Sequence, residues 1–142
     1  MRFNELIAKY EGLKLSAYKC PAGVWTIGYG TTIYPNGKPV KQGDTCTKSE
    51  AGIYLTDYLE TIKSLIQPFC DNEQQVIALE SLIYNIGWGA FSKSKCWDAI
   101  KQRDWTTAIK NWDWYSANGK PLLGLIKRRA EEIGLFFSNI EK

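Results

Sequence analysis

The amino-terminal part of the chain changes its hydrophobic period. Asn4 is a typical N-cap, and apolar residues at helical spacing after it predict a short helix that ends at about Glu11. Residues 13–19 and 25–32 instead alternate between apolar and polar side chains, and residues 21–23 between them have turn composition. The pattern predicts one helix followed by a β-hairpin.

Only helical periodicity follows the hairpin. Residues 47–50, Thr-Lys-Ser-Glu, have the spacing of a capping box and begin a predicted helix that ends before Pro68. Residues 76–86 are apolar nearly all round, so a helix that begins after Asn72 should lie in the core. Further helices are expected at residues 96–102, 105–112 and 123–137.

Two of these helices have a defined expected core face. The face of the helix that follows the capping box is Ala51, Leu55, Tyr58, Leu59, Ile62 and Ile66. The face of the last helix is Leu123, Ile126, Ala130, Ile133 and Phe137. Both sets recur at three- and four-residue spacing, which is typical of amphipathic helices.

The order of the elements predicts an α+β fold. A chain of 142 residues with 44% apolar residues can bury one core, so we expect a single domain over residues 1–142. A small lobe with the first helix and the β-hairpin would comprise residues 1–46, and a larger helical lobe residues 47–142. A cleft between such lobes would suit an extended polymer.

Composition excludes several kinds of chemistry. The chain has no histidine, so neither a histidine-containing zinc site nor an imidazole base is available. The four cysteines contain no CxxC pair, so we expect no metal and no cofactor, and most of the thiols should be small buried hydrophobic groups. Carboxylates, thiols and hydroxyls remain for catalysis.

The net charge of +3 is unevenly distributed along the chain. Lysines dominate residues 9–48, acidic residues dominate 49–80, and lysine and arginine dominate 93–129. The basic segments are either ordinary solvated surface or a face that attracts a polyanion. Nucleic acid and the bacterial wall are both polyanions, but the aromatic residues follow core spacing and are not interleaved with basic ones, which argues against nucleic acid.

Glu11 is a candidate proton donor. The carbonyl groups at a helix C-terminus carry partial negative charge, which disfavours an ionised carboxylate there. A carboxylic acid that keeps its proton near neutrality can donate it to a leaving oxygen. The alternative is an ordinary surface glutamate at a frayed helix end.

The hairpin register decides whether Cys20 and Thr26 meet. If Ala22-Gly23-Val24 is a three-residue loop, Cys20 lies directly opposite Thr26, on the same face, with Cβ atoms about 5 Å apart. A thiol and a hydroxyl held in this way can position a water molecule. A two-residue loop would place the two side chains on opposite faces.

The spacing of Glu11, Cys20 and Thr26, followed by Gly28-Tyr29-Gly30, resembles the active-site pattern of the phage-type lysozymes, glycoside hydrolase family 24. The resemblance covers nearly the whole chain. Other similar blocks are Gly43-Asp44-Thr45, Gln74-Gln75, Ala78-Leu79, Asn85-Ile86-Gly87, Gly89-Ala90-Phe91 and residues 124–132. The resemblance implies a lysozyme-like fold.

The resemblance also implies an activity, cleavage of the β-1,4 bond between N-acetylmuramic acid and N-acetylglucosamine in peptidoglycan. Glu11 would be the general acid, and Cys20 occupies a position that is usually aspartate in the family. Thr26 would help to hold the attacking water, with inversion at the anomeric carbon. The protein would serve a phage or prophage as its endolysin.

Cysteine at position 20 leaves several roles open. A free thiol has a pKa near 8.5, so it is mostly protonated at pH 7 unless positive charge from Lys14 or Lys19 lowers that pKa. Cys20 could act as a base, act as a nucleophile or be a structural residue of an inactive site. It could also be caged by a disulfide to Cys46, Cys70 or Cys96.

The resemblance places sugar contacts at Thr32, Tyr84, Asn85 and Ser94, although Tyr84 could equally be a core residue. Arg128 and Arg129 belong to a block that would pack near the acid. One of them could pair with Glu11 and orient it. At least one of the two is expected to be a solvated arginine on the last helix.

Two other functions are consistent with the sequence. One is a lytic transglycosylase, in which the 6-hydroxyl of the substrate attacks and Glu11 suffices. The other is a non-catalytic peptidoglycan-binding module. In every case we expect a monomer without stable membrane insertion or an export signal, made in the host cytoplasm and released to the wall through a separate membrane pore.

Overall fold

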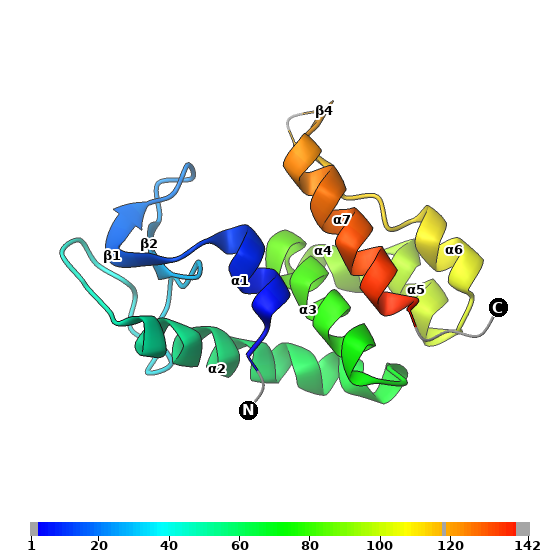
Figure 1. Ribbon diagram of the computed structural model, residues 1–142, viewed down its shortest axis with the longest axis horizontal. Helices are drawn as coiled ribbons and strands as arrows, with labels where there is room; N and C mark the ends of the chain where they lie inside the picture. The colour runs from blue at the N-terminus through cyan, green and yellow to red at the C-terminus, as the bar shows by residue number, and fades with distance from the viewer. Residues whose placement is uncertain (1–2, 118, 139–142) are drawn as a thin grey trace. The chain divides into compact units, whose positions relative to one another are not determined.

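The computed structural model describes residues 3–117 and 119–138. Two compact units divide the chain, one up to Thr61 and the other from Ile62 onward. Helices dominate, and two small antiparallel strand pairs accompany them, so the predicted α+β class is confirmed (Figure 1). The single-domain organisation with a lobe boundary after residue 46 stays a prediction.

Helix α1, Glu5–Glu11, forms as the sequence predicts. The side chain of Asn4 accepts a hydrogen bond from the Ile7 amide at 3.0 Å and so caps the first turn. Gly12 ends the helix with a φ of 72°, a conformation that suits glycine. These local signals place Glu11 at the helix exit.

Strands β1, Lys14–Lys19, and β2, Trp25–Gly28, form the antiparallel hairpin (Figure 1). Tyr18 lies opposite Thr26, whereas the first residue of β1 lies opposite the last residue of β2. The two pairings differ in register, so β1 contains an irregularity of the β-bulge type between them. Such a bulge bends the strand and increases its twist.

Helix α2, Lys48–Ile66, begins at the predicted capping box. The amide of Glu50 donates to Thr47 Oγ1 at 3.1 Å, and the Thr47 amide donates to Glu50 Oε1 at 2.9 Å. The expected apolar stripe is buried with one exception, because Tyr58 is 57% exposed. The stripe therefore predicts the packed face of α2 correctly except at this aromatic ring.

Replacing Thr47 with alanine is expected to lower the free energy of unfolding by about 1 kcal/mol, because the substitution removes the acceptor of the Glu50 amide. Urea denaturation followed by circular dichroism measures this loss. Thr47→Ser is the matched control and should lose much less, since the serine hydroxyl can make the same bond. Equal losses in the two variants would contradict the capping role.

The second unit contains the remaining elements. They are the 3₁₀ helix η1 Gln67–Phe69, helices α3 Glu73–Ile86, α4 Trp88–Ser92, α5 Lys95–Lys101, α6 Trp105–Lys110 and α7 Leu123–Phe136, and strands β3 Ser116–Ala117 and β4 Lys120–Pro121. Asn72 caps α3, and eight residues of this helix are buried, as its apolar sequence predicts. Helix α4 and the β3–β4 pair are too short to have produced a periodic signal.

Helix α7 packs against α3, but not through the expected face (Figure 1). Leu123 and Ile126 are 66% and 43% exposed, Ala130 is also exposed, and Ile133 and Phe137 are only partly buried, so the predicted apolar face is wrong. Instead α7 buries Arg128, Arg129 and Glu132 together with Phe136. Charged residues can take these positions because they pair with one another, as described below.

Candidate active site

Glu11 is the last residue of α1 and is partly exposed. The amide of Gly12 donates to the carbonyl of Ala8 at 3.1 Å, which closes the final turn beneath it. Two residues later the chain enters β1. The carboxyl group therefore stands at a helix C-terminus within the unit that also holds the hairpin, as the sequence predicts.

The hairpin loop is one residue earlier than expected. The amide of Cys20 donates to the carbonyl of Val24 at 3.0 Å, and the amide of Gly23 donates to the carbonyl of Cys20 at 2.8 Å. Cys20 thus pairs with Val24, while Thr26 pairs with Tyr18, so the predicted direct opposition of Cys20 and Thr26 is wrong. The residue opposite Thr26 is two positions earlier in the chain than expected. Because side chains alternate between the faces of a strand, Cys20 and Thr26 still lie on the same face, as diagonal neighbours.

Local hydrogen-bond donors favour the thiolate form of Cys20. The backbone amide of Val24 contributes most, and the Ala22 amide and the Thr26 hydroxyl add to it, so the pKa of Cys20 is lowered although burial opposes the shift. A thiol in this setting carries more thiolate at neutral pH than an isolated one. The backbone amides of the tight loop therefore lower the pKa of Cys20, an effect that the sequence could not show.

Lys14 and Lys19, the two neighbouring lysines, do not lower the pKa of Cys20. Neither Lys14 nor Lys19 is among the causes of the lowered pKa of Cys20. The ammonium group of Lys19 lies 5.5 Å from the centre of the Trp25 ring, in a cation–π contact. The expectation that lysine charge activates the thiol is therefore replaced by activation from backbone amides.

The hydroxyl group of Thr26 lies near both the Cys20 thiol and the Val24 carbonyl. Its side chain is 4% exposed, and its Oγ1 donates to the carbonyl of Val24 at 2.9 Å. A hydroxyl has one proton, so it can serve either this carbonyl or a thiolate at Cys20, and its lone pairs stay available to a water molecule. Thr26 can thus adapt to the protonation state of its neighbour.

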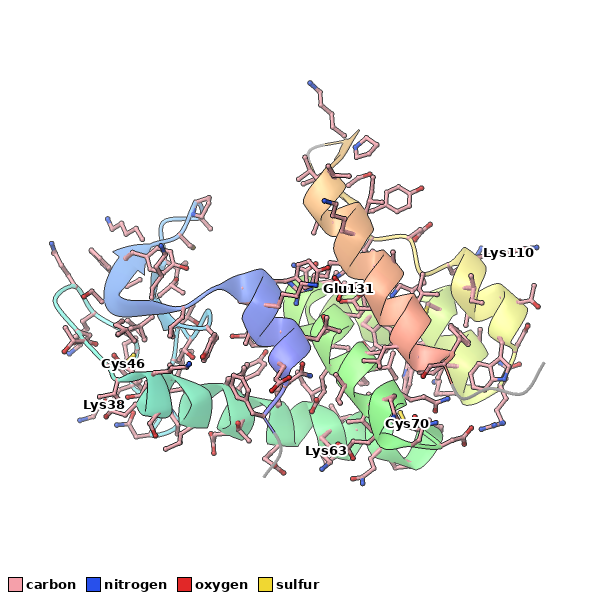
Figure 2. All side chains as sticks on the ribbon, viewed as in Figure 1. Lys38, Cys46, Lys63, Cys70, Lys110 and Glu131 are labelled. Carbon is pink, nitrogen blue, oxygen red and sulfur yellow. The ribbon has the colours of Figure 1, made fainter. Side chains whose placement is uncertain are left out.

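All four cysteines lie in the described part of the chain, and all four are free thiols. Cys46, just before α2, and Cys96 are buried, while Cys20 and Cys70 are partly exposed. Figure 2 labels Cys46 and Cys70. Burial raises the pKa of Cys70 and of Cys96 to about 12, which makes both thiols unreactive at neutral pH. Cys20 differs from these three, because its pKa is the one that is lowered.

The second unit buries an ionic cluster around Glu132. Its Oε2 accepts hydrogen bonds from Ser81 Oγ at 2.6 Å and from Arg129 Nη2 at 2.8 Å, and its Oε1 accepts from Trp112 Nε1 at 3.3 Å. Arg128 Nε lies 3.4 Å from Oε2 and donates to Ser81 Oγ at 3.2 Å. The side chain of Glu132 is fully buried, so these partners replace its hydration.

Both arginines of this cluster are buried, with residue exposures of 3% for Arg128 and 2% for Arg129. The expectation that at least one of them is solvated is therefore wrong. Arg129 also donates to the side chain of Asn85 at 2.9 Å and to the carbonyl of Trp114 at 3.0 Å. Its Nε lies 2.6 Å from Glu132 Oε1, although the N–H direction does not form a hydrogen bond there.

The other expected sugar contacts occupy different settings. Thr32 is exposed and Tyr84 is partly buried. Asn85 is exposed, and its Oδ1 is held by Arg129. Ser94 caps α5, because its Oγ accepts from the Trp97 amide at 3.1 Å and donates to the Phe91 carbonyl at 2.7 Å.

Two members of the ionic cluster were missed from the sequence. Ser81 is a polar residue inside the apolar run of α3, and Glu132 follows the arginines at three- and four-residue spacing. That spacing is the signal that could have predicted the ion pairs. Nothing in the sequence indicates that they are buried.

No three acidic or cysteine side chains gather into a possible metal site among residues 3–117 and 119–138. Within the same residues, no helix combines the length and the apolar character needed to cross a membrane.

Comparisons with known proteins show the family of this chain. A sequence model of the phage lysozyme family matches residues 8–132. An endolysin of Acyrthosiphon pisum secondary endosymbiont phage 1 is 38% identical over 143 residues, which cover 94% of this chain and 93% of the relative. An endolysin of Salmonella phage P22 is 31% identical over 93% of this chain and 92% of its own.

Solved structures show the same fold. An endolysin from Escherichia coli O157:H7 phage FAHEc1 superposes with a TM-score of 0.80 at 28% identity, over 100% of this chain and 97% of its own. The muramidase domain of SpmX from Asticaccaulis excentricus has a TM-score of 0.78 at 33% identity, over 94% and 92% of the two chains. The chain belongs to the phage lysozyme family and is a glycosidase of the endolysin type.

Proposed function

We propose that this chain hydrolyses the β-1,4 bond between N-acetylmuramic acid and N-acetylglucosamine, with Glu11, Cys20 and Thr26 as its catalytic residues. The observation that carries the proposal is the hairpin geometry. Cys20 and Thr26 share one face, and the Val24 amide lowers the pKa of the thiol, in a chain whose family match spans both residues. A partly exposed thiolate beside a hydroxyl can activate and hold a water molecule.

In the proposed reaction Glu11 donates its carboxylic proton to the glycosidic oxygen while the bond from that oxygen to the anomeric carbon breaks. A water molecule attacks the anomeric carbon from the opposite face. The Cys20 thiolate takes the proton of this water, and the Thr26 hydroxyl orients it. Glu11 and Cys20 then exchange protons with solvent, and the configuration at the anomeric carbon is inverted.

The substrate contacts remain part of the proposal. Thr32 is exposed on the hairpin unit, and Tyr84 and Asn85 lie at the end of α3, where their side chains can meet sugar hydroxyls. The hydroxyl of Ser94 already caps α5, so Ser94 would position neighbouring residues and not contact the sugar itself.

Arg128 and Arg129 also act as positioning residues in this proposal, since their guanidinium groups are held by Glu132. Arg129 reaches the substrate through Asn85, whose side-chain oxygen accepts its hydrogen bond.

Cys20 variants test the proposed base. Cys20→Asp should retain activity, because a carboxylate can take the same proton, and Cys20→Ala should lose about a hundredfold at pH 7. Both the wild type and Cys20→Asp need a protonated Glu11, but only the wild type must ionise a thiol. The ratio of the wild-type rate to the Cys20→Asp rate should therefore rise with pH through the pKa of Cys20, because aspartate is ionised throughout the neutral range.

Initial rates on purified peptidoglycan between pH 5 and 9 provide the measurement. Equal losses in Cys20→Asp and Cys20→Ala would contradict the role as base. Retained anomeric configuration with a covalent sugar adduct on Cys20 would show instead that the thiol is a nucleophile.

We further propose that the enzyme acts as a monomer and reaches the wall through a separate membrane pore. The substrate of the family, the cell wall, lies beyond the cytoplasmic membrane, so an enzyme made in the cytoplasm must cross that membrane. Expression in a bacterial host should then lyse cells upon chloroform treatment but not before it. Lysis without permeabilisation would contradict the need for a pore.

A further inference from the structure

The hairpin unit has a pocket that none of the proposed catalytic residues lines. Its volume is about 510 Å³, which lies within the range of small-ligand sites. The pocket is bounded by the turn that contains Lys38, by the segment before Cys46 and by α2. Lys38 and Cys46 are labelled in Figure 2. The lining residues are Tyr34, Pro35, Asn36, Asp44, Thr45 and Tyr54.

Aromatic rings form part of this wall. The rings of Tyr34 and Tyr54 meet edge to face, with centroids 5.2 Å apart and planes at 67°. Pro35 adds a flat apolar ring beside them. Such surfaces suit the apolar C–H face of a sugar ring, while neighbouring polar groups reach its hydroxyls.

Polar groups with spare hydrogen-bonding capacity surround the rings. Asp44 Oδ2 accepts from the Tyr34 hydroxyl at 2.7 Å and from the Lys41 amide at 3.0 Å, while Oδ1 accepts no hydrogen bond within the described part of the chain. Asn36 Oδ1 accepts from the Lys38 amide at 2.9 Å, which leaves the side-chain NH₂ as a donor. Tyr54 adds a hydroxyl.

The charge of the pocket favours a neutral ligand. The Lys41 amide and the Tyr34 hydroxyl lower the pKa of Asp44, so its carboxylate is ionised at neutral pH. The positive charge of Lys41 also stabilises that carboxylate and partly compensates it. An anionic ligand would be repelled by Asp44, and a cation would compete with Lys41.

We infer that this pocket binds an N-acetylglucosamine residue of the glycan strand, outside the place where the strand is cut. N-acetylglucosamine is neutral, whereas the lactyl carboxyl of muramic acid is joined to a charged stem peptide. The inference rests on the proposed function, because the wall glycan is the polymer on which the enzyme acts. An additional sugar contact would hold the enzyme on an insoluble strand between cleavage events.

Direct binding is measured on the Glu11→Gln protein, which cannot consume the ligand. Titration with the trimer of N-acetylglucosamine should shift the side-chain NH₂ signals of Asn36 and the ring signals of Tyr34 and Tyr54, and the shifts should saturate. Binding is observed at these named groups, so occupancy of the catalytic site does not produce the readout.

Cosedimentation with sacculi distinguishes binding through the pocket from binding through the rest of the surface. In the Glu11→Gln background, Tyr54→Phe and Asn36→Ala should each weaken cosedimentation with purified sacculi about fivefold, the effect of one lost hydrogen bond. Tyr58→Phe is the matched control, because it removes the hydroxyl group of an exposed tyrosine on the same helix, outside the pocket. This variant should leave cosedimentation unchanged.

Three results would overturn the inference. These are the absence of shifts at Asn36 and the two tyrosines, a stronger response to a lysine-containing stem peptide than to the trimer, and equal cosedimentation of all the variants. Wild-type hydrolysis is assayed separately. If the trimer does not bind at the pocket while the wild type still hydrolyses peptidoglycan, this inference alone is contradicted. If the trimer binds there but the wild type does not hydrolyse peptidoglycan, the proposed function alone is contradicted.

Discussion

Replacing Glu11 with glutamine is expected to lower the rate of wall hydrolysis by about 10²–10⁴-fold, the usual contribution of a general acid. The amide cannot donate a proton to the leaving oxygen. Glu11 is partly exposed at the end of α1, so the change should leave the fold intact. Turbidity loss of purified peptidoglycan measures the rate, and circular dichroism measures the fold.

Glu5→Gln is the matched control for this experiment. Glu5 lies in the first turn of the same helix and is exposed, so its substitution removes the same charge at the opposite end. The control should retain its rate within about twofold, since exposed substitutions away from special features have small effects. Full activity of Glu11→Gln would exclude Glu11 as the acid.

Glu132→Gln is expected to lower the free energy of unfolding by about 3–5 kcal/mol. The substitution removes the buried carboxylate that both Arg128 and Arg129 contact. Urea denaturation provides the measurement. Tryptophan fluorescence is a suitable probe, since Trp112 and Trp114 belong to the same cluster.

Asp71→Asn is the control for the buried cluster. It breaks a bidentate pair with Arg103, at 2.7 and 2.8 Å, that is about half exposed on both sides. Exposed pairs of this kind contribute about 0–1 kcal/mol. Comparable losses in Asp71→Asn and Glu132→Gln would contradict the claim that burial makes the α7 cluster critical.

The sequence predicted elements whose signals are local. Asn4 and the Thr47–Glu50 box cap their helices with side-chain bonds that depend on residues three positions apart. Such bonds can be recognised without knowledge of the rest of the fold. The amino-terminal ends of α1 and α2 follow from them.

The core face of α7 could not be predicted in the same way. Apolar periodicity assigns charged residues to solvent, and it selected Leu123 and Ile126, which are exposed. Arg128 and Glu132 are buried because Ser81 on α3 and their mutual pairing satisfy them. That compensation depends on a tertiary contact between distant segments, which periodicity does not contain.

The register of the hairpin was predicted only in part from the sequence. Gly23 adopts a φ of 81°, as the turn requires, but a left-handed glycine is compatible with more than one loop boundary. The actual loop moves the pairing by two positions, so the shared face of Cys20 and Thr26 was predicted correctly and their direct opposition was not. The amides of Ala22 and Val24 near the thiol follow from this loop and from nothing visible in the sequence.

In hydrolysis, the water molecule held at Cys20 and Thr26 supplies the new hydroxyl at the anomeric carbon, with Glu11 as the acid. Digestion of purified peptidoglycan in ¹⁸O-labelled water, followed by mass spectrometry of the fragments, shows the origin of that oxygen. We expect reducing muramic acid ends that contain one labelled oxygen. Anhydro-muramic ends, lighter by one water and free of label, would contradict it and identify a transglycosylase.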